Sequence, residues 1–107
     1  MLFKRSTSAK SLSPAEANAQ ADLQIIDVRS REEWSTGHID RAINIPLDQL
    51  PNHLAGLDTG QPVAFVCQSG TRSRTATKIA AQAGLDAINI TGGMTAWGRA
   101  GLPTSTR

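Results

Sequence analysis

Apolar residues in this chain gather in short runs that are separated by more polar segments. The runs occupy residues 23–28, 42–45, 63–67 and 87–90, and each has about the length of a buried strand. Strands that are apolar on both faces and alternate with helices are typical of a mainly parallel sheet covered by helices. The pattern therefore predicts the α/β class.

The segments between these runs carry helix signals. Ser13 is placed as an N-cap, Pro14 as the first helical residue and Glu16 as the partner that completes a capping box, which predicts a helix to about Ala21. Apolar residues at helical spacing predict a longer helix over 72–83. A short helix or a turn is expected over residues 30–37. Short helices are expected over residues 47–54 and in the segment that follows Gly92 and Gly93 and includes Trp97.

The length and the charge distribution favour one domain preceded by a tail. A chain of 107 residues has room for one compact unit, and we expect it to be a monomer. The net charge of +2 comes from Lys4, Arg5 and Lys10, because 8 basic and 9 acidic residues follow them. We therefore expect a flexible basic tail over residues 1–10, a folded domain over residues 11–107, and no nucleic-acid partner.

No apolar run is long enough to span a membrane or to form the core of a signal peptide, so we expect no membrane insertion. Cys67 is the only cysteine, which excludes an internal disulfide, and a lone thiol that must stay reduced favours the cytoplasm. His38 and His53 lie 15 positions apart and do not match a metal-ligand spacing with Cys67. We expect no bound metal.

The candidate chemistry lies where the most apolar strand ends. Cys67 closes that strand and is followed by a loop that leads directly into a helix and consists of Gln68, Ser69, Gly70, Thr71, Arg72 and Ser73. Gly70 permits a backbone conformation in which consecutive amides turn toward one point, and together with the helix N-terminus they favour a thiolate over a thiol. Arg72 and Arg74 stand in the first helical turn, which indicates a nearby anion such as the thiolate, an anionic substrate or Asp27.

Two alternatives compete with a reactive thiolate in this loop. A cysteine at the end of an apolar strand is often a small buried hydrophobe, although such a residue needs no anion cradle. Cysteine phosphatases also use such a loop, but they place five residues between the cysteine and an arginine. Here four residues separate Cys67 from Arg72, and no obvious aspartic general acid accompanies them. A phosphatase is therefore the less favoured enzyme.

Four segments, in order, resemble the rhodanese family from about residue 10 to Pro103. They are Asp27-Val28-Arg29 with Glu33-Trp34; Gly37-His38-Ile39 with 42–46; the loop 67–73; and Gly92-Gly93-Met94 with Trp97 and 100–103. The resemblance implies a five-stranded parallel sheet with helices on both faces, and a sulfurtransferase that needs no metal or organic cofactor. It implies that Cys67 takes a sulfane sulfur from thiosulfate or a persulfide and passes it to a thiol or cyanide.

Departures from the family pattern concern the substrate. Many family members have arginine directly after the cysteine, and members specialised for thiosulfate have lysine one position later, where this chain has Gln68 and Ser69. We therefore favour a thiol persulfide as donor. The chain has no second cysteine to resolve the persulfide, so the acceptor is expected to be an external thiol or a protein. A non-catalytic binding module or a redox or persulfide sensor is the alternative class.

Several other residues are expected to have structural roles. Asp27 and Arg29 follow the first apolar run, and we expect them to support the loop as a buried ion pair, although they could also line the pocket or pair with the loop arginines. His38 follows a glycine and is interpreted as a hydrogen-bonded structural residue. Trp34 and Trp97 are interpreted as core residues.

Overall fold

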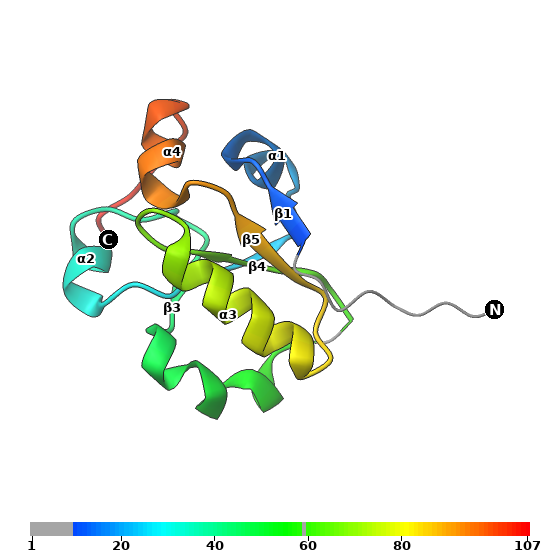
Figure 1. Cartoon of the computed structure of the whole chain (residues 1–107). Coiled ribbons are helices and arrows are strands. Elements are labelled where there is room, and N and C mark those ends of the chain that lie inside the picture. Colours follow the sequence, from blue (N-terminus) through cyan, green and yellow to red (C-terminus); the bar gives the residue numbers. More distant parts are fainter. Residues whose placement is uncertain (1–9, 59) are drawn as a thin grey trace.

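The computed structural model describes residues 10–58 and 60–107 (Figure 1). Five strands form one sheet in the order β1-β5-β4-β2-β3, and every neighbouring pair is parallel. The strands are β1 (Lys10–Leu12), β2 (Gln24–Asp27), β3 (Ile43–Asn44), β4 (Val63–Val66) and β5 (Ala87–Ile90). The predicted α/β class with a parallel sheet is confirmed.

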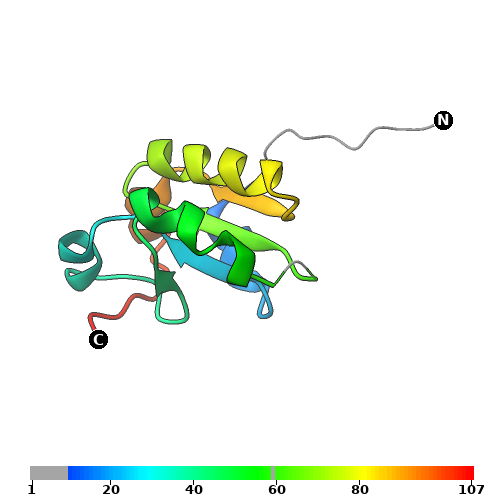
Figure 2. The ribbon, with the colours of Figure 1, turned by 90° about the horizontal axis from the view of Figure 1, so that it is seen from below.

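Helices cover both faces of this sheet. In Figure 1, α1 and α4 lie above the sheet and α3 lies below it with the two 3₁₀ helices η1 and η2, and Figure 2 shows the lower layer from beneath. The helices are α1 (Pro14–Ala19), α2 (Arg31–Ser35), η1 (Leu47–Asn52), η2 (Leu54–Gly56), α3 (Thr71–Gln82) and α4 (Gly93–Arg99). The sheet is thus the middle layer of three.

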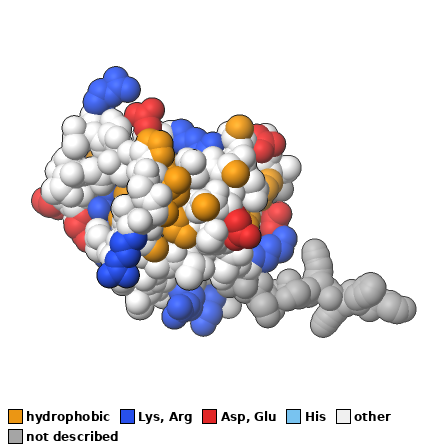
Figure 3. Space-filling model, turned by 90° about the horizontal axis from the view of Figure 1, so that it is seen from above, with side chains coloured by type: hydrophobic (Ala, Val, Ile, Leu, Met, Phe, Trp, Pro, Cys, Tyr) orange, Lys and Arg blue, Asp and Glu red, His pale blue; other side chains and the backbone are white. Residues whose placement is uncertain are grey.

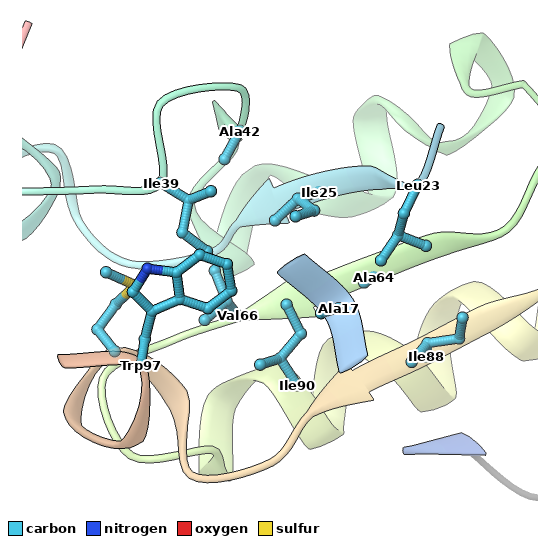
Figure 4. Packing of buried hydrophobic residues seen from close by; sticks show 11 residues of the cluster. Ala17, Leu23, Ile25, Ile39, Ala42, Ala64, Val66, Ile88, Ile90 and Trp97 are labelled. Carbon is cyan, nitrogen blue, oxygen red and sulfur yellow. The ribbon is translucent and has the colours of Figure 1, made fainter. Parts of the chain in front are cut away.

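Each face of the sheet has its own hydrophobic core. Between the sheet and the α1/α4 layer, Trp97 is fully buried and packs with side chains of β2, β4 and β5 (Figure 4). On the α3 side, Phe65 and Leu50 are buried with Cys67 in a second cluster. Residues that alternate along a strand face opposite cores, which explains why the strands are apolar on both faces.

Strand β1 is the element that the sequence pattern did not predict. Its three residues are mostly polar, and they form a strand because they add to the edge of the sheet, where Lys10 pairs with Ile88. Lys10 thus belongs to the sheet rather than to the predicted tail over 1–10, whose other residues, 1–9, lie outside the described residues.

The predicted helix over 47–54 is a pair of 3₁₀ helices, η1 and η2, rather than one regular helix. Pro51 lies inside η1. Proline lacks an N–H and its ring clashes with the carbonyl four residues earlier, so a longer α-helix cannot form through this position. Leu50 is nevertheless buried, so the apolar side of this segment faces the core as the amphipathic pattern indicated.

Two capping boxes begin the helices that follow Ser13 and Ser30. The predicted box is present in α1, where the amide of Glu16 donates to Ser13 Oγ at 3.1 Å and the Ser13 amide donates to Glu16 Oε1 at 2.8 Å. A second box starts α2, with Ser30 and Glu33 in the same roles. It places the Glu33 carboxylate at the carboxyl edge of the sheet, beside the cysteine loop.

Charges of both signs are interspersed on the face seen in Figure 3, which is the side of α1 and α4. None of the helices within residues 10–58 and 60–107 is long and apolar enough to cross a membrane. Within the same ranges, no three His, Cys, Asp or Glu residues are arranged to hold a metal ion.

Candidate active site

Strand β4 delivers Cys67 to the carboxyl edge of the sheet. The residue is 1% exposed and follows Val66, which pairs with Asp27 of β2. The chain then reverses at Gly70, whose φ of 107° lies in the left-handed region, and α3 starts at the next residue. Glycine occupies this region at little cost, so the predicted need for it in this loop is met at Gly70.

Neutral donors surround the sulfur of Cys67. The Gly70 amide donates to Sγ at 3.0 Å, and Ser73 Oγ lies 3.4 Å from Sγ. Burial raises the pKa of the Cys67 thiol, but the Ser73 hydroxyl and the amides of Ser73, Gly70 and Ser69 outweigh it and lower the pKa below its ordinary value. The geometry thus favours a thiolate in a neutral cradle.

The first turn of helix α4 makes backbone hydrogen bonds to this loop. The amide of Met94 donates to the Cys67 carbonyl at 2.8 Å, and the amide of Thr95 donates to the Gln68 carbonyl at 3.1 Å. Gly93, with φ of 60°, is so close that a Cβ there would overlap the Cys67 carbonyl oxygen and the backbone of Gln68. The Gly92-Gly93 turn therefore fixes the position of the loop, in addition to starting the helix.

Asp27 and Arg29 form a buried ion pair next to the loop. Arg29 Nη2 lies 2.8 Å from Asp27 Oδ2, and both side chains are almost completely buried. Arg29 also donates to Gln68 Oε1 at 3.2 Å and to the Gly37 carbonyl at 2.7 Å. This pair therefore ties the end of β2 to the first residue of the loop. Asn44 Nδ2 donates to the Asp27 and Arg29 carbonyls at 3.0 Å each.

Arg72 pairs with Glu33 rather than with Asp27. Two bonds of 2.8 and 2.9 Å join the guanidinium to both carboxylate oxygens. The pairing with Arg72 lowers the pKa of Glu33 to about 2. Of the possible partners of the loop arginines, Asp27 makes its ion pair with Arg29 instead and affects Arg72 only through space. Glu33 also raises the pKa of Arg72, and the Cys67 charge adds to this effect.

The remaining predicted site residues differ in their surroundings. The exposed Gln68 is held in place, because its Nε2 donates to Thr95 Oγ1 at 3.1 Å while Arg29 holds its oxygen. Ser69 and Thr71 are exposed at the rim of the loop. Arg74 is exposed as well, and its side chain makes no hydrogen bond or ion pair with the described residues, so the structure does not bring it to the sulfur.

A hollow of about 380 Å³ lies beside the loop. Its apolar lining comes from Val28, Pro46 and Leu47, and Arg72 and Asp48 contribute charged groups. The Val28 amide donates to the Val66 carbonyl at 2.9 Å, so Val28 is next to Cys67 in the fold. The hollow is thus on the same side of the sheet as the sulfur, since Val28 and Cys67 share one hydrophobic cluster.

Sequence reasoning gave no role in the site to two polar residues, Glu33 and Asn89. Glu33 could have been found, because Ser30-x-x-Glu33 is a capping-box pattern like the one recognised at Ser13. Asn89 is a polar residue inside the apolar strand β5, and its Oδ1 accepts from Ser73 at 2.6 Å. A buried polar side chain needs a partner, but the sequence does not show which one.

The other structural interpretations concern His38 and the tryptophans. His38 Nδ1 lies 2.8 Å from the Trp34 carbonyl, and its ring stacks on that of Trp34 at 3.5 Å. Trp97 is fully buried and donates to the Pro103 carbonyl at 2.9 Å, whereas Trp34 is partly buried. His53 is exposed. The contacts of His38, Trp34 and Trp97 are therefore structural, whereas His53 lies at the surface.

The fold is a parallel α/β sheet, and a six-residue loop at the junction of β4 and α3 surrounds a cysteine sulfur. These features place the protein in the class that binds an anion at a strand–helix junction. A family model described as the rhodanese-like domain matches residues 11–100. The putative sulfurtransferase YtwF of Bacillus subtilis is 37% identical over 79 residues, which are 74% of this chain and 77% of that protein.

Two further proteins extend the comparison. The thiosulfate sulfurtransferase GlpE of Shewanella oneidensis is 32% identical over 76 residues, which are 70% of this chain and 75% of that protein. The crystal structure of a rhodanese-related protein from Thermoplasma volcanium matches with a TM-score of 0.87 and 28% identity, and covers 92% of this chain and 99% of that one. The chain therefore belongs to the rhodanese family.

Proposed function

We propose that the protein is a sulfurtransferase in which Cys67 carries a sulfane sulfur as a persulfide. The observation that carries the proposal is the sulfur of Cys67 held by the Gly70 amide at 3.0 Å and by Ser73 at the start of α3. This environment lowers the pKa of the thiol and so favours the thiolate, which is the nucleophile of the proposed reaction. The sulfurtransferase names of two family relatives support the same activity.

The first step moves a sulfur atom to Cys67. The thiolate attacks the outer sulfur of a donor R–S–SH, the new S–S bond forms, and the donor S–S bond breaks with its electron pair leaving on R–S⁻. Cys67 is left as Cys–S–SH. In the second step an acceptor thiolate attacks the outer sulfur, takes it as a new persulfide and restores the Cys67 thiolate. With cyanide as acceptor, thiocyanate and the Cys67 thiol are formed.

The loop supports this cycle because its donors are neutral. Charge moves between the cysteine sulfur and the outer sulfur during the cycle, and fixed amides can stabilise it at both positions without a proton transfer. No general base is needed in this scheme, because Cys67 attacks as the thiolate that the loop donors favour.

A thiol persulfide is the donor that we propose. Thiosulfate is a small dianion, and this chain has Gln68 and Ser69 at the positions where a cation would bind it. The hollow beside the loop has an apolar lining of Val28, Pro46 and Leu47, which suits the carbon skeleton of a thiol. The acceptor is proposed to be an external thiol or a protein, because Cys67 is the only cysteine. A thiol that works reduced also supports a cytoplasmic location.

Intact mass measurement tests the persulfide. The protein is incubated with thiosulfate or with a low-molecular-weight persulfide, and its mass is recorded before and after addition of cyanide. We expect a gain of one sulfur atom that cyanide removes, and no gain in Cys67→Ser, which is nearly isosteric and should keep the fold. Folded, reduced protein that gains no sulfur from either donor would refute the proposal.

Turnover separates the enzyme from the alternative of a persulfide or redox sensor. An enzyme releases many equivalents of thiocyanate per protein chain when donor and cyanide are in excess, whereas a sensor releases about one. Kinetics with the two donors side by side then test the donor preference. A higher kcat/KM for thiosulfate than for the thiol persulfide would overturn the donor assignment and leave the sulfurtransferase assignment in place.

A further inference from the structure

Three buried polar groups form a line that ends at the reactive sulfur. Ser73 Oγ lies 3.4 Å from Cys67 Sγ on one side and 2.6 Å from Asn89 Oδ1 on the other. Ser73 is fully buried, Cys67 is 1% exposed and Asn89 is 5% exposed. Because all three side chains are buried, water cannot easily replace either contact. The three side chains must therefore satisfy one another's hydrogen bonds.

Ser73 has a single hydroxyl proton for two possible acceptors. While Cys67 is a thiol, its S–H can donate to Ser73 Oγ, and the hydroxyl donates to Asn89 Oδ1, as the 2.6 Å contact indicates. When Cys67 loses its proton to solvent, the sulfur becomes an acceptor only. The hydroxyl must then turn toward Sγ, and this turn takes the proton away from Asn89.

An asparagine can follow this change because its amide carries an acceptor and a donor at nearly the same distance from the Cβ atom. Rotation of the amide by half a turn replaces Oδ1 by Nδ2, with almost no change in shape. Nδ2–H then donates to Ser73 Oγ while the hydroxyl donates to the thiolate. The contact between Ser73 Oγ and Asn89 is then a hydrogen bond in both protonation states of Cys67, which a group that only accepts could not achieve.

We propose that Asn89 is a positioning residue that directs the Ser73 hydroxyl toward or away from the Cys67 sulfur by turning its side-chain amide. The role deepens the proposed sulfurtransferase function, on which its use in catalysis rests. The thiolate of the first step receives the Ser73 proton, and Asn89 supplies the compensating donor. Its effect is transmitted only through Ser73.

The charged groups already present near the loop are left unchanged in the variants that test this role, and the one added charge is the carboxylate of Asn89→Asp. Those groups are Arg72 on α3 and Asp27 at the end of β2, with Glu33 and Arg29 as their ion-pair partners. Changes in the thiol pKa between these variants therefore report on Asn89 and Ser73.

The first experiment measures the pH profile of Cys67 alkylation by iodoacetamide in four proteins, which are the wild type, Asn89→Asp, Ser73→Ala and the double variant. A carboxylate only accepts, so Asn89→Asp keeps the Ser73 proton away from Sγ in addition to adding a charge. We expect it to raise the thiol pKa by about one unit or more, which is about a tenfold loss of alkylation rate below the midpoint.

The Ser73→Ala background separates the two causes of this shift. The through-space effect of the added charge remains there, whereas the effect transmitted by the hydroxyl is lost, so the shift caused by Asn89→Asp should be clearly smaller. Equal shifts in the two backgrounds, or no shift in either, would overturn the role of Asn89. Alkylation needs no sulfur donor, so this result does not depend on whether the protein transfers sulfur.

A second measurement does not depend on whether a variant with a buried carboxylate folds. The two side-chain ¹H–¹⁵N signals of Asn89 are followed against pH in the wild type and in Ser73→Ala. We expect them to move with the midpoint of Cys67 ionisation in the wild type, and to move much less in Ser73→Ala, where only the through-space charge is felt. Signals that stay constant in the wild type, or that move equally in both proteins, would contradict a turning amide.

Discussion

Arg72 is a cation of the cysteine loop and its charge interacts with that of Cys67, yet its two strong bonds go to Glu33. The thiolate of Cys67 is therefore stabilised mainly by neutral groups, namely the Ser73 hydroxyl and the loop amides. A thiolate with a very low pKa is a poorer nucleophile, because basicity and nucleophilicity fall together. Moderate stabilisation by neutral donors is consistent with a sulfur that has to attack, hold and release another sulfur atom.

The Arg72–Glu33 pair can be tested with Glu33→Gln, which keeps the side-chain oxygen that caps α2 and removes the charge. The two side chains are 40% and 35% exposed, so solvent screens their attraction, and we expect a loss of at most about 1 kcal/mol at neutral pH. Urea unfolding of both proteins measures this difference.

The same difference should depend on pH in one direction. Folding lowers the pKa of Glu33 from 4.5 to about 2. A carboxyl group with a lowered pKa in the folded state contributes its full stability above the unfolded value, and loses it as the pH falls through the folded value. We therefore expect the gap between wild type and Glu33→Gln to be constant above pH 4.5 and to shrink from there toward pH 2. A gap that grows on acidification would contradict the pairing.

Helix α4 acts on the chemistry through its first residue. Because Gly93 has a φ of 60° and abuts the Cys67 carbonyl, Gly93→Ala introduces both backbone strain and overlap with the loop. Left-handed strain of about 1–2 kcal/mol and overpacking of about 1–3 kcal/mol together predict a loss of about 2–5 kcal/mol. Thermal or urea unfolding, combined with the alkylation rate of Cys67, detects both the destabilisation and the displaced loop.

Gly98 provides a matched control in the same helix. A Cβ there meets nothing within 4 Å, and its φ is outside the left-handed region, so Gly98→Ala should leave the protein equally stable or slightly more stable. Equal effects of the two substitutions would mean that Gly93 matters only as a helical glycine and does not position the loop.

The elements that the sequence predicted best are those with a strong local signal. The capping box of Ser13, the apolar strands β4 and β5 and the helix that follows Gly70 all combine composition with a defined start or stop. Strand β1 has no such signal, because three mostly polar residues become a strand only by pairing with β5. At η1, Pro51 leads to a 3₁₀ helix instead of an α-helix, while Leu50 is buried as the amphipathic pattern indicated.

The candidate site was predictable where its residues are consecutive. The cysteine loop and the Asp27–Arg29 ion pair lie within short stretches of chain, so their chemistry could be interpreted in place. The partnerships of Arg72 with Glu33 and of Ser73 with Asn89 join residues that are 39 and 16 positions apart. Such pairs depend on how strands and helices are stacked, which periodicity along the chain does not specify.

The site as a whole lies at the carboxyl edge of the sheet, where the ends of β2 and β4 meet the starts of η1 and α3. In parallel sheets this edge is the usual place for ligands, because strands end and helix N-termini begin there. The hollow beside the loop uses this arrangement, since Val28 follows β2, Leu47 starts η1 and Arg72 belongs to α3. A donor bound there would be contacted by segments that are distant in sequence.

Leu47 lets the donor preference be tested at this junction. Leu47→Ala removes apolar surface from the hollow, and we expect it to lower kcat/KM for a thiol persulfide about tenfold, because an apolar side-chain contact contributes about 1–2 kcal/mol to binding. Thiosulfate has no carbon skeleton, so its kcat/KM should change little. Leu54→Ala is the control, because Leu54 packs on the same core from η2 without lining the hollow. If both substitutions weakened both donors equally, the effect would arise from lost stability, and the hollow would have no part in selecting the donor.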